Sequence, residues 1–464
     1  MMSEQALKLP LSDLEREQEN RGREAQRLLL QAHLAARGTG NVGPALEIRG
    51  AEESTRLGQL RLHERTVTSI FGDVRVSRTG YGAPGCGSVH PLDEQAALPS
   101  RQFSDELRRR LIIGVVQGPF DEAIERVEEG TGVVLSKLSA EQMTAESARD
   151  FEDFYAERKP PPSGETGPIV VADVDCKGVP MVKPEEAQRT PRRGKGKKPH
   201  KKRMATVGAV FTQQPRVRTP EEVTASLFAT GPRPGDAGSK SPKPEHKRIW
   251  ASLKEPKETV IAAIAQEAEG RDPKREKIRV AVTDGERALQ QGVLAVIPGV
   301  ILVLDFLHVL EKLWKAAYCF YPEGSPEAVE WVRERTLALL QGRVSQVVKG
   351  MTQSATKRGL RAHQRKAVDE AARYMLRNKK FMRYHGYLRD GLPIASGAVE
   401  GACKNLVKDR LERSGMRWTI DGAEAVLKLR AAHLSGDFEE YWAFHLKQEQ
   451  ERRYPIEHWK VVAK

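Results

Sequence analysis

The spacing of hydrophobic residues along this chain changes near residue 160. Upstream of that point, apolar residues recur mostly at the three- and four-residue intervals of amphipathic helices. A proline-rich stretch, residues 160–164, then predicts a linker. Downstream, short apolar runs alternate with helical segments, which is the pattern of an α/β domain. The strands predicted there are 169–174, 206–211, 278–283 and 300–304.

Three regions are predicted before the linker. Residues 1–50 form a polar helix and a linker, and residues 51–100 contain two alternating runs that predict a β-hairpin with its turn at Gly72 and Asp73. Residues 101–159 are helical. Two of these helices could form a DNA-binding helix-turn-helix, but the second is not notably basic, so a plain helical hairpin is the slightly favoured interpretation.

After the linker, residues 165–464 predict one mixed α/β domain. Its first two strands are separated by a basic loop, residues 187–203, which is too rich in charge, glycine and proline to fold alone. Over about residues 321–390 the pattern is wholly helical and predicts an all-helical insertion. The main helices expected in it are 327–349 and 361–377.

Composition narrows the class of protein. The 464 residues are 39% hydrophobic and 30% charged, which is typical of a folded soluble protein. The net charge of +13 and the pI near 9.5 favour a polyanionic partner such as nucleic acid. The four cysteines are widely spaced, and the sequence shows neither a signal-peptide pattern nor an apolar stretch of about 20 residues. We therefore expect a cytoplasmic protein without a membrane segment.

Three acidic residues carry the candidate chemistry. Asp175 and Asp284 each end an apolar strand, and Glu400 lies on a later helix. That helix is expected to begin at Ser396, a residue type that favours helix N-caps. Carboxylates that converge from two strand ends and a facing helix can hold divalent cations for phosphodiester chemistry. Taken singly, each aspartate could instead cap a turn, and Glu400 could pair with Lys404.

Three further residues are secondary candidates. Asp173 lies two residues before Asp175 on the same face of the strand and competes with it for the first role. Asp175 is preferred because it directly precedes the turn. Asp305 ends a strand and could cap the next helix. His308 lies opposite the apolar stripe of that helix, which argues against a core position, so both residues could support the site.

Five blocks of the sequence share their pattern with one known family. The blocks are 175–181, 202–210, 282–287, 305–314 and 393–405, the last running on to 415–418. Together they resemble the ISKra-type bacterial insertion-sequence transposases, which are DDE transposases with a ribonuclease-H-like catalytic domain. The resemblance covers nearly everything after about Val67, and the final block is quite specific.

The resemblance implies a ribonuclease-H-like mixed sheet with flanking helices and a helical insertion, preceded by a small hairpin and a helical N-terminal region. It maps Asp175, Asp284 and Glu400 onto the DDE triad, which holds two Mg²⁺ ions for which Mn²⁺ can substitute. The segment 305–308 is similar to the Asp/Cys-x-x-His signature of Mutator-like relatives.

One departure from the family concerns zinc. Relatives tend to carry a Cys-Pro-x-Cys zinc-ribbon element after the hairpin, but the matching stretch, residues 83–87, contains only Cys86. His90 does not complete a four-ligand site. We therefore expect a degenerate hairpin without zinc.

By resemblance, the chain cleaves insertion-sequence ends and joins them to target DNA. It would bind terminal inverted repeats as a homo-oligomer on DNA and be nucleoid-associated. Two alternatives stay open, namely a decayed transposase that only binds DNA and a ribonuclease-H-like cellular nuclease. The basic loop and the Glu400 helix are expected to contact DNA phosphates. The expected contacts are Arg192, Arg193, Lys195, Lys197, Lys198, Lys201, Lys202, Arg203, Lys404, Lys408 and Arg410.

Overall fold

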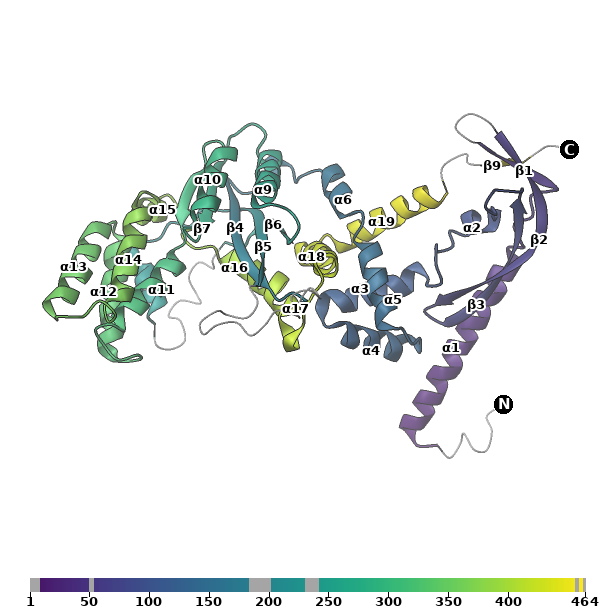
Figure 1. Ribbon diagram of the computed structural model, residues 1–464, viewed down its shortest axis with the longest axis horizontal. Coiled ribbons are helices and arrows are strands. Elements are labelled where there is room, and N and C mark those ends of the chain that lie inside the picture. Colours follow the sequence, from purple (N-terminus) through teal and green to yellow (C-terminus); the bar gives the residue numbers. More distant parts are fainter. Residues whose placement is uncertain (1–8, 50–53, 183–201, 230–241, 455–458, 462–464) are drawn as a thin grey trace, which may run out of the picture. The chain divides into compact units, whose positions relative to one another are not determined.

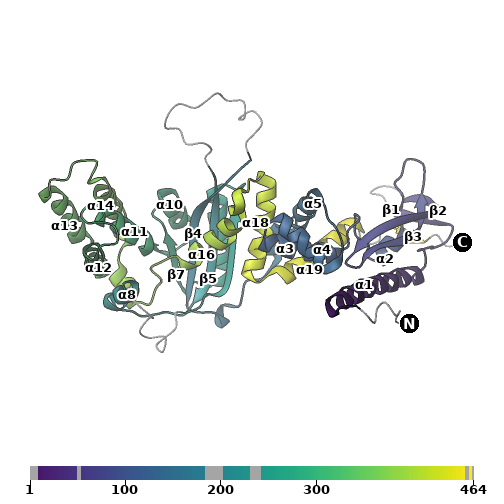
Figure 2. The ribbon, with the colours of Figure 1, turned by 90° about the horizontal axis from the view of Figure 1, so that it is seen from below.

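The chain divides into two compact units, each described here by itself (Figures 1 and 2). The first unit consists of Met1–Glu157 and Gly436–Lys464, and the second of Arg158–Ser435. The chain therefore leaves the first unit once and rejoins it once. The computed structural model describes residues 9–49, 54–182, 202–229, 242–454 and 459–461.

A five-stranded mixed sheet forms the centre of the second unit. Its strand order is β6-β5-β4-β7-β8, so β4 lies in the middle. β5 pairs antiparallel with β4 and β6, whereas β7 runs parallel to both β4 and β8. This mixed α/β arrangement is consistent with the fold class expected from the sequence. The strands are β4 Ile169–Val179, β5 Arg203–Gln213, β6 Glu245–Ser252, β7 Ile278–Thr283 and β8 Ile301–Leu304.

Four of these strands lie where the apolar runs predict them. β4 and β5 extend beyond the predicted runs because they pair with each other along their whole length, from Ile169 opposite Gln213 to Val179 opposite Arg203. β6 was not predicted. Every residue of its first half, residues 245–248, is charged or polar. This half therefore lacks the apolar run by which the other strands are recognised.

Helices cover both faces of this sheet. α9 packs on β5, where a Cβ at Gly208 would lie 3.0 Å from the side chain of Ile264. α16 and the π-helix η4 lie against β4. Because side chains alternate along a strand, Asp175 faces η4 whereas Cys176 faces Lys257 of α9. The elements are α9 Lys257–Arg271, α10 Arg287–Val296, α16 Gly397–Ala402, η4 Cys403–Lys408, α17 Asp409–Leu411, η5 Arg413–Gly415 and α18 Ile420–Ser435.

The all-helical insertion follows β8 and packs its buried side chains into the same apolar core as β7 and β8. The single helix predicted over 327–349 is two helices, because Gly342 has a left-handed φ of +83° that ends the first one. A Cβ there would also lie 2.5 Å from the His385 ring. The helices in and before this region are η2 Ser163–Glu165, α8 Pro220–Leu227, α11 Phe306–Ala317, α12 Pro326–Leu340, α13 Val344–Lys357, α14 Lys366–Asn378, η3 Lys379–Phe381 and α15 Tyr384–Arg389.

The first unit contains a four-stranded antiparallel sheet of order β3-β2-β1-β9. The predicted hairpin is confirmed, but its turn lies two residues earlier than predicted. Ser69 pairs with Gly72, so Ile70 and Phe71 form the turn, and Gly72 enters the strand at a φ of +108° that a side chain disfavours. The strands are β1 Ala45–Arg49, β2 Ser54–Ser69, β3 Gly72–Gly82 and β9 Trp459–Val461.

The helices of the first unit enclose a cluster of buried charges. Arg108 of α3 donates to Glu449 of α19 at 2.8 Å, and His445 Nδ1 lies 2.6 Å from Asp150 Oδ2. These contacts place the C-terminal helix in the first unit, whereas the sequence predicts one domain that continues to residue 464. The helices are α1 Leu11–Ala36, α2 Pro91–Gln95, α3 Asp105–Gln117, α4 Phe120–Thr131, α5 Lys137–Ser147, α6 Phe151–Glu157 and α19 Phe438–Arg453.

Candidate active site

Asp175 and Asp284 lie towards the carboxyl ends of the neighbouring strands β4 and β7. Asp284 directly follows β7, but the turn predicted after Asp175 is wrong, because β4 stays paired with β5 as far as Val179. β4 and β7 pair in parallel at Val171 and Val280, and Asp175 and Asp284 each follow four residues later. The Asp284 carboxylate accepts a hydrogen bond from the Glu286 backbone N–H at 2.8 Å. Burial, and to a smaller extent the negative charge of Asp175, raise the pKa of Asp284. A carboxylate whose ionisation is disfavoured by burial and by a neighbouring negative charge is in an environment that favours a bound cation.

Asp173 has a different environment from Asp175. Its side chain is only 1% exposed, and its Oδ1 accepts a hydrogen bond from the Val282 backbone N–H at 3.0 Å. This bond continues the pairing of β4 with β7 beyond the last backbone pair, Val171 with Val280. Burial raises the pKa of Asp173 well above its ordinary value. The geometry gives Asp173 a role between the strands and leaves Asp175 as the better candidate for a ligand.

The helix that carries Glu400 is attached to Asp175. α16 contacts β4, and the Cys403 thiol donates to Asp175 Oδ2 at 3.2 Å, while Oδ1 accepts from the Cys176 backbone N–H at 2.7 Å. Glu400 lies one helical turn before Cys403 and its side chain is exposed. The helix continues as a π-helix, a distortion that is frequent at functional sites.

The donor chemistry of the aspartates suits a hard divalent cation, because Mg²⁺ prefers carboxylate oxygens. Within the residues that the structure describes, however, no group of three or more His, Cys, Asp or Glu side chains is close enough to hold a metal ion. The assignment of Asp175, Asp284 and Glu400 as metal ligands is therefore a proposal.

Asp305 connects the end of β8 to the start of the Glu400 helix. As predicted, its side chain caps α11 by accepting from the Leu307 backbone N–H at 2.8 Å. Its Oδ2 accepts from both the backbone N–H and the hydroxyl of Ser396. Ser396 is the N-cap residue of α16, as predicted, but its side chain makes no capping hydrogen bond. The hydroxyl is engaged by Asp305 instead.

His308 is held next to the same aspartate. Its Nδ1 lies 3.5 Å from Asp305 Oδ2, and this carboxylate raises the pKa of His308 to about 9. The imidazole is therefore positively charged at neutral pH. Its charge in turn acts to lower the pKa of Asp284, against the effect of burial. The structure thus places His308 close enough to both Asp284 and Asp305 for their charges to interact, at the end of the sheet where they were predicted.

A contact that the sequence did not predict fixes the turn after β7. Tyr374 of α14 donates through its hydroxyl to the Asp284 carbonyl oxygen at 2.7 Å, and Arg377 donates to the Gly285 carbonyl oxygen at 3.2 Å. Gly285 has a φ of +89°, and a Cβ there would lie 2.9 Å from the Tyr374 ring. The glycine after Asp284 was the one sequence signal for this close approach.

The residues predicted to contact DNA differ in their environments. Arg192, Arg193, Lys195, Lys197, Lys198 and Lys201 lie outside the described residues. Lys202 forms an ion pair with Glu412, and Arg203 donates to the Leu253 carbonyl oxygen at 2.8 Å. Lys404 and Lys408 are exposed. Arg410 is fully buried, with its guanidinium 4.9 Å from the centre of the Trp418 ring, so its assignment to a DNA-binding surface is wrong. It lies six residues after Lys404 and thus on another side of the helix.

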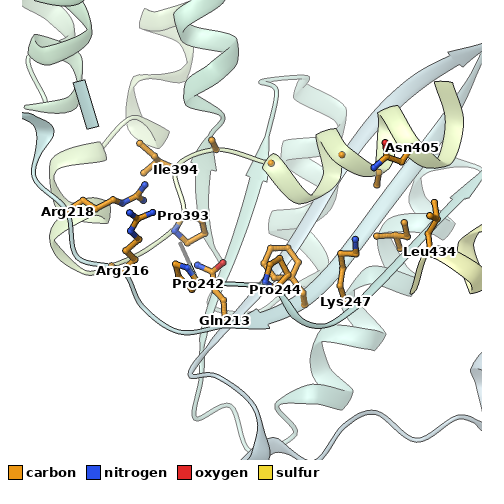
Figure 3. A pocket seen from close by; sticks show the side chains of 17 residues that line it. Gln213, Arg216, Arg218, Pro242, Pro244, Lys247, Pro393, Ile394, Asn405 and Leu434 are labelled. Atoms are coloured by element: carbon orange, nitrogen blue, oxygen red, sulfur yellow. The ribbon is translucent and has the colours of Figure 1, made fainter. Parts of the chain in front are cut away.

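A cavity of about 600 Å³ lies beside the Glu400 helix (Figure 3). Gly397, Gly401 and Asn405 form one wall, at the helical spacing of a single face. Arg216 and Arg218 lie at one end of the cavity. None of this was predicted, because the arginines occur in an unremarkable segment between β5 and α8.

Comparisons with known proteins add little to this geometry. No family model matches the chain, and no curated protein matches it. Among solved structures, the chain is similar to one titled "Drosophila P element transposase strand transfer complex", with 8% identity and a TM-score of 0.24, over 79% of this chain and 84% of that one. A likeness this slight carries no argument. In the described part of the chain, no helix is long and apolar enough to span a bilayer.

Proposed function

We propose that this chain is a DNA transposase that cleaves insertion-sequence ends and joins them to target DNA. The observation that carries the proposal is the pair Asp175 and Asp284 at one edge of the sheet, with the Glu400 helix attached to Asp175 through Cys403. The blocks of sequence that resemble ISKra-type transposases contain the same three acidic residues. The mixed sheet is consistent with the ribonuclease-H-like domain of that family.

In this proposal, Asp175, Asp284 and Glu400 hold two Mg²⁺ ions, and Mn²⁺ can take their place. When bound, such a pair of ions activates the attacking oxygen and stabilises the leaving one. The chain's own contribution is to position the ligands. Asp175 lies on β4 beyond its pairing with β7, Asp284 directly follows β7, and the Tyr374 hydroxyl holds the Asp284 backbone. Glu400 is exposed on its helix and thus accessible to both metal and DNA.

His308 and Asp305 have supporting roles in the proposal. The positive charge of His308 lies close enough to Asp284 to affect its pKa. A protonated imidazole can donate a charge-assisted hydrogen bond to a phosphate oxygen. Asp305 keeps the imidazole charged and, through Ser396, fixes the start of the Glu400 helix. Asp305 is therefore a positioning residue.

The distribution of charge supports DNA as the partner. Residues 341–390, which form the larger part of the helical insertion, contain 13 lysine and arginine residues but only three aspartate and glutamate residues. Most of the net charge of +13 thus lies in this segment, next to the turn that carries Asp284. Such a surface attracts the phosphates of DNA without regard to sequence. Terminal repeats and target DNA, bound by a homo-oligomer, complete the proposal.

A second candidate function is a DNA-binding protein that has lost catalysis. The observation that favours it is the absence, among the described residues, of a three-residue metal-binding group that includes Glu400. The two functions differ in their products, because a binding protein shifts labelled DNA in a gel but leaves its strands intact.

The test is an incubation of the full chain with labelled DNA that carries the inverted repeats flanking its own gene. The proposal predicts Mg²⁺-dependent strand cleavage and, with target DNA present, joined products. Binding without cleavage in Mg²⁺ or Mn²⁺ would favour the second function. Cleavage that ignores the repeats and never yields joined strands would favour a cellular nuclease.

A further inference from the structure

The cavity beside the Glu400 helix is lined by positive and apolar groups. Among the described residues, its lining contains no aspartate or glutamate, but it contains Arg216, Arg218 and Lys247. Phe211, Ile249 and Leu434 supply apolar surface. A volume of about 600 Å³ lies within the range of about 300–1,000 Å³ that is usual for small-molecule sites.

The two arginines are held by the backbone around them. The Arg216 N–H donates to the Gly391 carbonyl oxygen at 2.9 Å, and the Arg218 N–H donates to the Leu388 carbonyl oxygen at 3.2 Å. At Gly391, where φ is +72°, a Cβ would lie 2.8 Å from the Arg216 nitrogen. Residues two apart in an extended segment face the same side, so both guanidinium groups reach the cavity, as Figure 3 shows.

Two positive side chains lie close together at this end of the cavity. Burial lowers the pKa of Arg218, and the charge of Arg216 lowers it further, whereas Glu222 acts in the opposite direction. The Nε atom of Arg218 is buried and has no hydrogen-bond partner among the described residues. Its Nη2 reaches the Leu392 carbonyl oxygen only at 3.4 Å. Adjacent arginines with an unused buried donor are suited to bind a phosphate, which accepts several charge-assisted hydrogen bonds.

The rest of the cavity suits a flat heterocycle. Ile249 and Leu434 offer apolar contact, and the side-chain amides of Gln213 and Asn405 can donate to and accept from the edge of a base. Gly401 leaves space along the helix, since a Cβ there would meet no atom within 4 Å. Figure 3 shows Arg216 and Arg218 at one end of the cavity, with Asn405 and Leu434 at the other.

We propose that this cavity binds one nucleotide, with its phosphate at Arg216 and Arg218. Its base would lie between the apolar side chains of Ile249 and Leu434 and the side-chain amides of Gln213 and Asn405. The ligand is either a free nucleoside phosphate or an unpaired nucleotide of a nucleic-acid strand. Only the second source rests on the proposed function. In that case the neighbouring phosphate of the strand lies next to Glu400, because Gly397 and Gly401 are on the adjacent side of the same helix.

The experiment measures equilibrium binding to the full chain in the presence of a chelator, so that strand cleavage cannot affect the result. The probes are deoxyadenosine monophosphate, a short fluorescent single-stranded oligonucleotide and inorganic phosphate. The variants are Arg218→Gln, which removes a phosphate donor, and Gly401→Leu, which fills the cavity while retaining every charge. Lys243→Gln is the matched control, because Lys243 is an exposed cation in the same segment as Lys247 and does not line the cavity.

Arg218→Gln and Gly401→Leu are each expected to weaken nucleotide or oligonucleotide binding by about tenfold or more, and Lys243→Gln by about twofold or less. Binding of the monophosphate identifies a free nucleotide as the ligand, and binding of the oligonucleotide alone identifies a strand. The proposal is overturned if inorganic phosphate binds as tightly as either probe, if neither probe binds, or if Gly401→Leu binds as the wild type does. Failure of DNA cleavage in the earlier assay would leave this measurement unchanged.

Discussion

Two aspartates that are neighbours on one strand are expected to respond differently to substitution. Asp173 is buried and accepts a hydrogen bond from Val282, whereas Asp175 is less buried and accepts one from the Cys403 thiol. Because burial raises the pKa of Asp173, an uncharged amide should replace it well. Asp173→Asn is therefore expected to retain both stability and DNA cleavage, and Asp173→Ala to lose about 1–3 kcal/mol of unfolding free energy.

Asp175→Asn is expected to keep a stability close to that of the wild type but to lose DNA cleavage. Urea unfolding and the cleavage assay, applied to all three variants, measure both properties. If Asp173→Asn abolished cleavage while Asp175→Asn retained it, the assignment of the two residues would have to be exchanged.

Tyr374 is expected to act through the backbone of Asp284. Tyr374→Phe removes one hydrogen bond, at 2.7 Å, to the Asp284 carbonyl oxygen while keeping the ring that packs on Gly285. A bond of this kind contributes about 0.5–1.5 kcal/mol, so kcat should fall by roughly 2- to 12-fold with little change in KM for DNA. Tyr318→Phe, a partly exposed tyrosine of the same unit, is the control. A change in KM alone would point to a DNA-contact role.

At the scale of single elements, the acidic residues of the candidate site could be predicted from the sequence, but the contacts that hold them in place could not. Asp175 and Asp284 were recognisable because each ends an apolar run, and the chemistry of strand ends is general. The Tyr374 contact joins residues 90 positions apart, and no local pattern encodes such a separation. The break at Gly342 was missed because apolar residues keep a helical spacing on both sides of it.

The hairpin of the first unit provides a prediction about pH. His63 Nδ1 and His90 Nε2 lie 2.8 Å apart, and burial, with the charge of Arg78, lowers the pKa of His90 from 6.5 to about 4. Between these two values the unfolded chain binds a proton at His90 and the folded chain does not. Proton binding to the unfolded chain therefore lowers the free energy of unfolding as the pH falls from 6.5 towards 4, whereas above pH 6.5 His90 has no such effect.

Urea unfolding of the wild type and of His90→Asn between pH 7 and pH 4 tests this expectation. The wild type should lose more stability than the variant across that window. Parallel curves for the two proteins would show that His90 titrates normally in the folded chain.

At the scale of the whole molecule, the chain returns to its first unit for its last helix. The sequence did not predict this return, because the pattern of α19 is that of any helix and its partners lie far away: Arg108 and Glu449 are 341 positions apart. Tyr441 and His445 of α19 are completely buried in that unit. A boundary drawn from local composition cannot detect such a contact.

Truncation after Ser435 is accordingly expected to unfold the first unit and spare the second. Loss of α19 removes Glu449 from Arg108 and His445 from Asp150, and breaking one buried ion pair costs about 3–5 kcal/mol. Limited proteolysis should show rapid cleavage within residues 1–157 and a stable fragment of about 158–435. Truncation after Tyr454, which keeps α19, is the control. Equal protection of residues 1–157 in both truncations would contradict the role given to α19.

The central claim is that Asp175, Asp284 and Glu400 act together in metal-dependent cleavage of DNA. The most direct measurement compares Asp284→Asn with Asp390→Asn, an exposed aspartate at the end of α15 whose loss removes the same charge. Both variants are incubated with labelled element-end DNA and Mg²⁺. The account predicts that Asp284→Asn binds this DNA but does not cleave it, while Asp390→Asn cleaves as the wild type does. Mg²⁺-dependent cleavage by Asp284→Asn would contradict it.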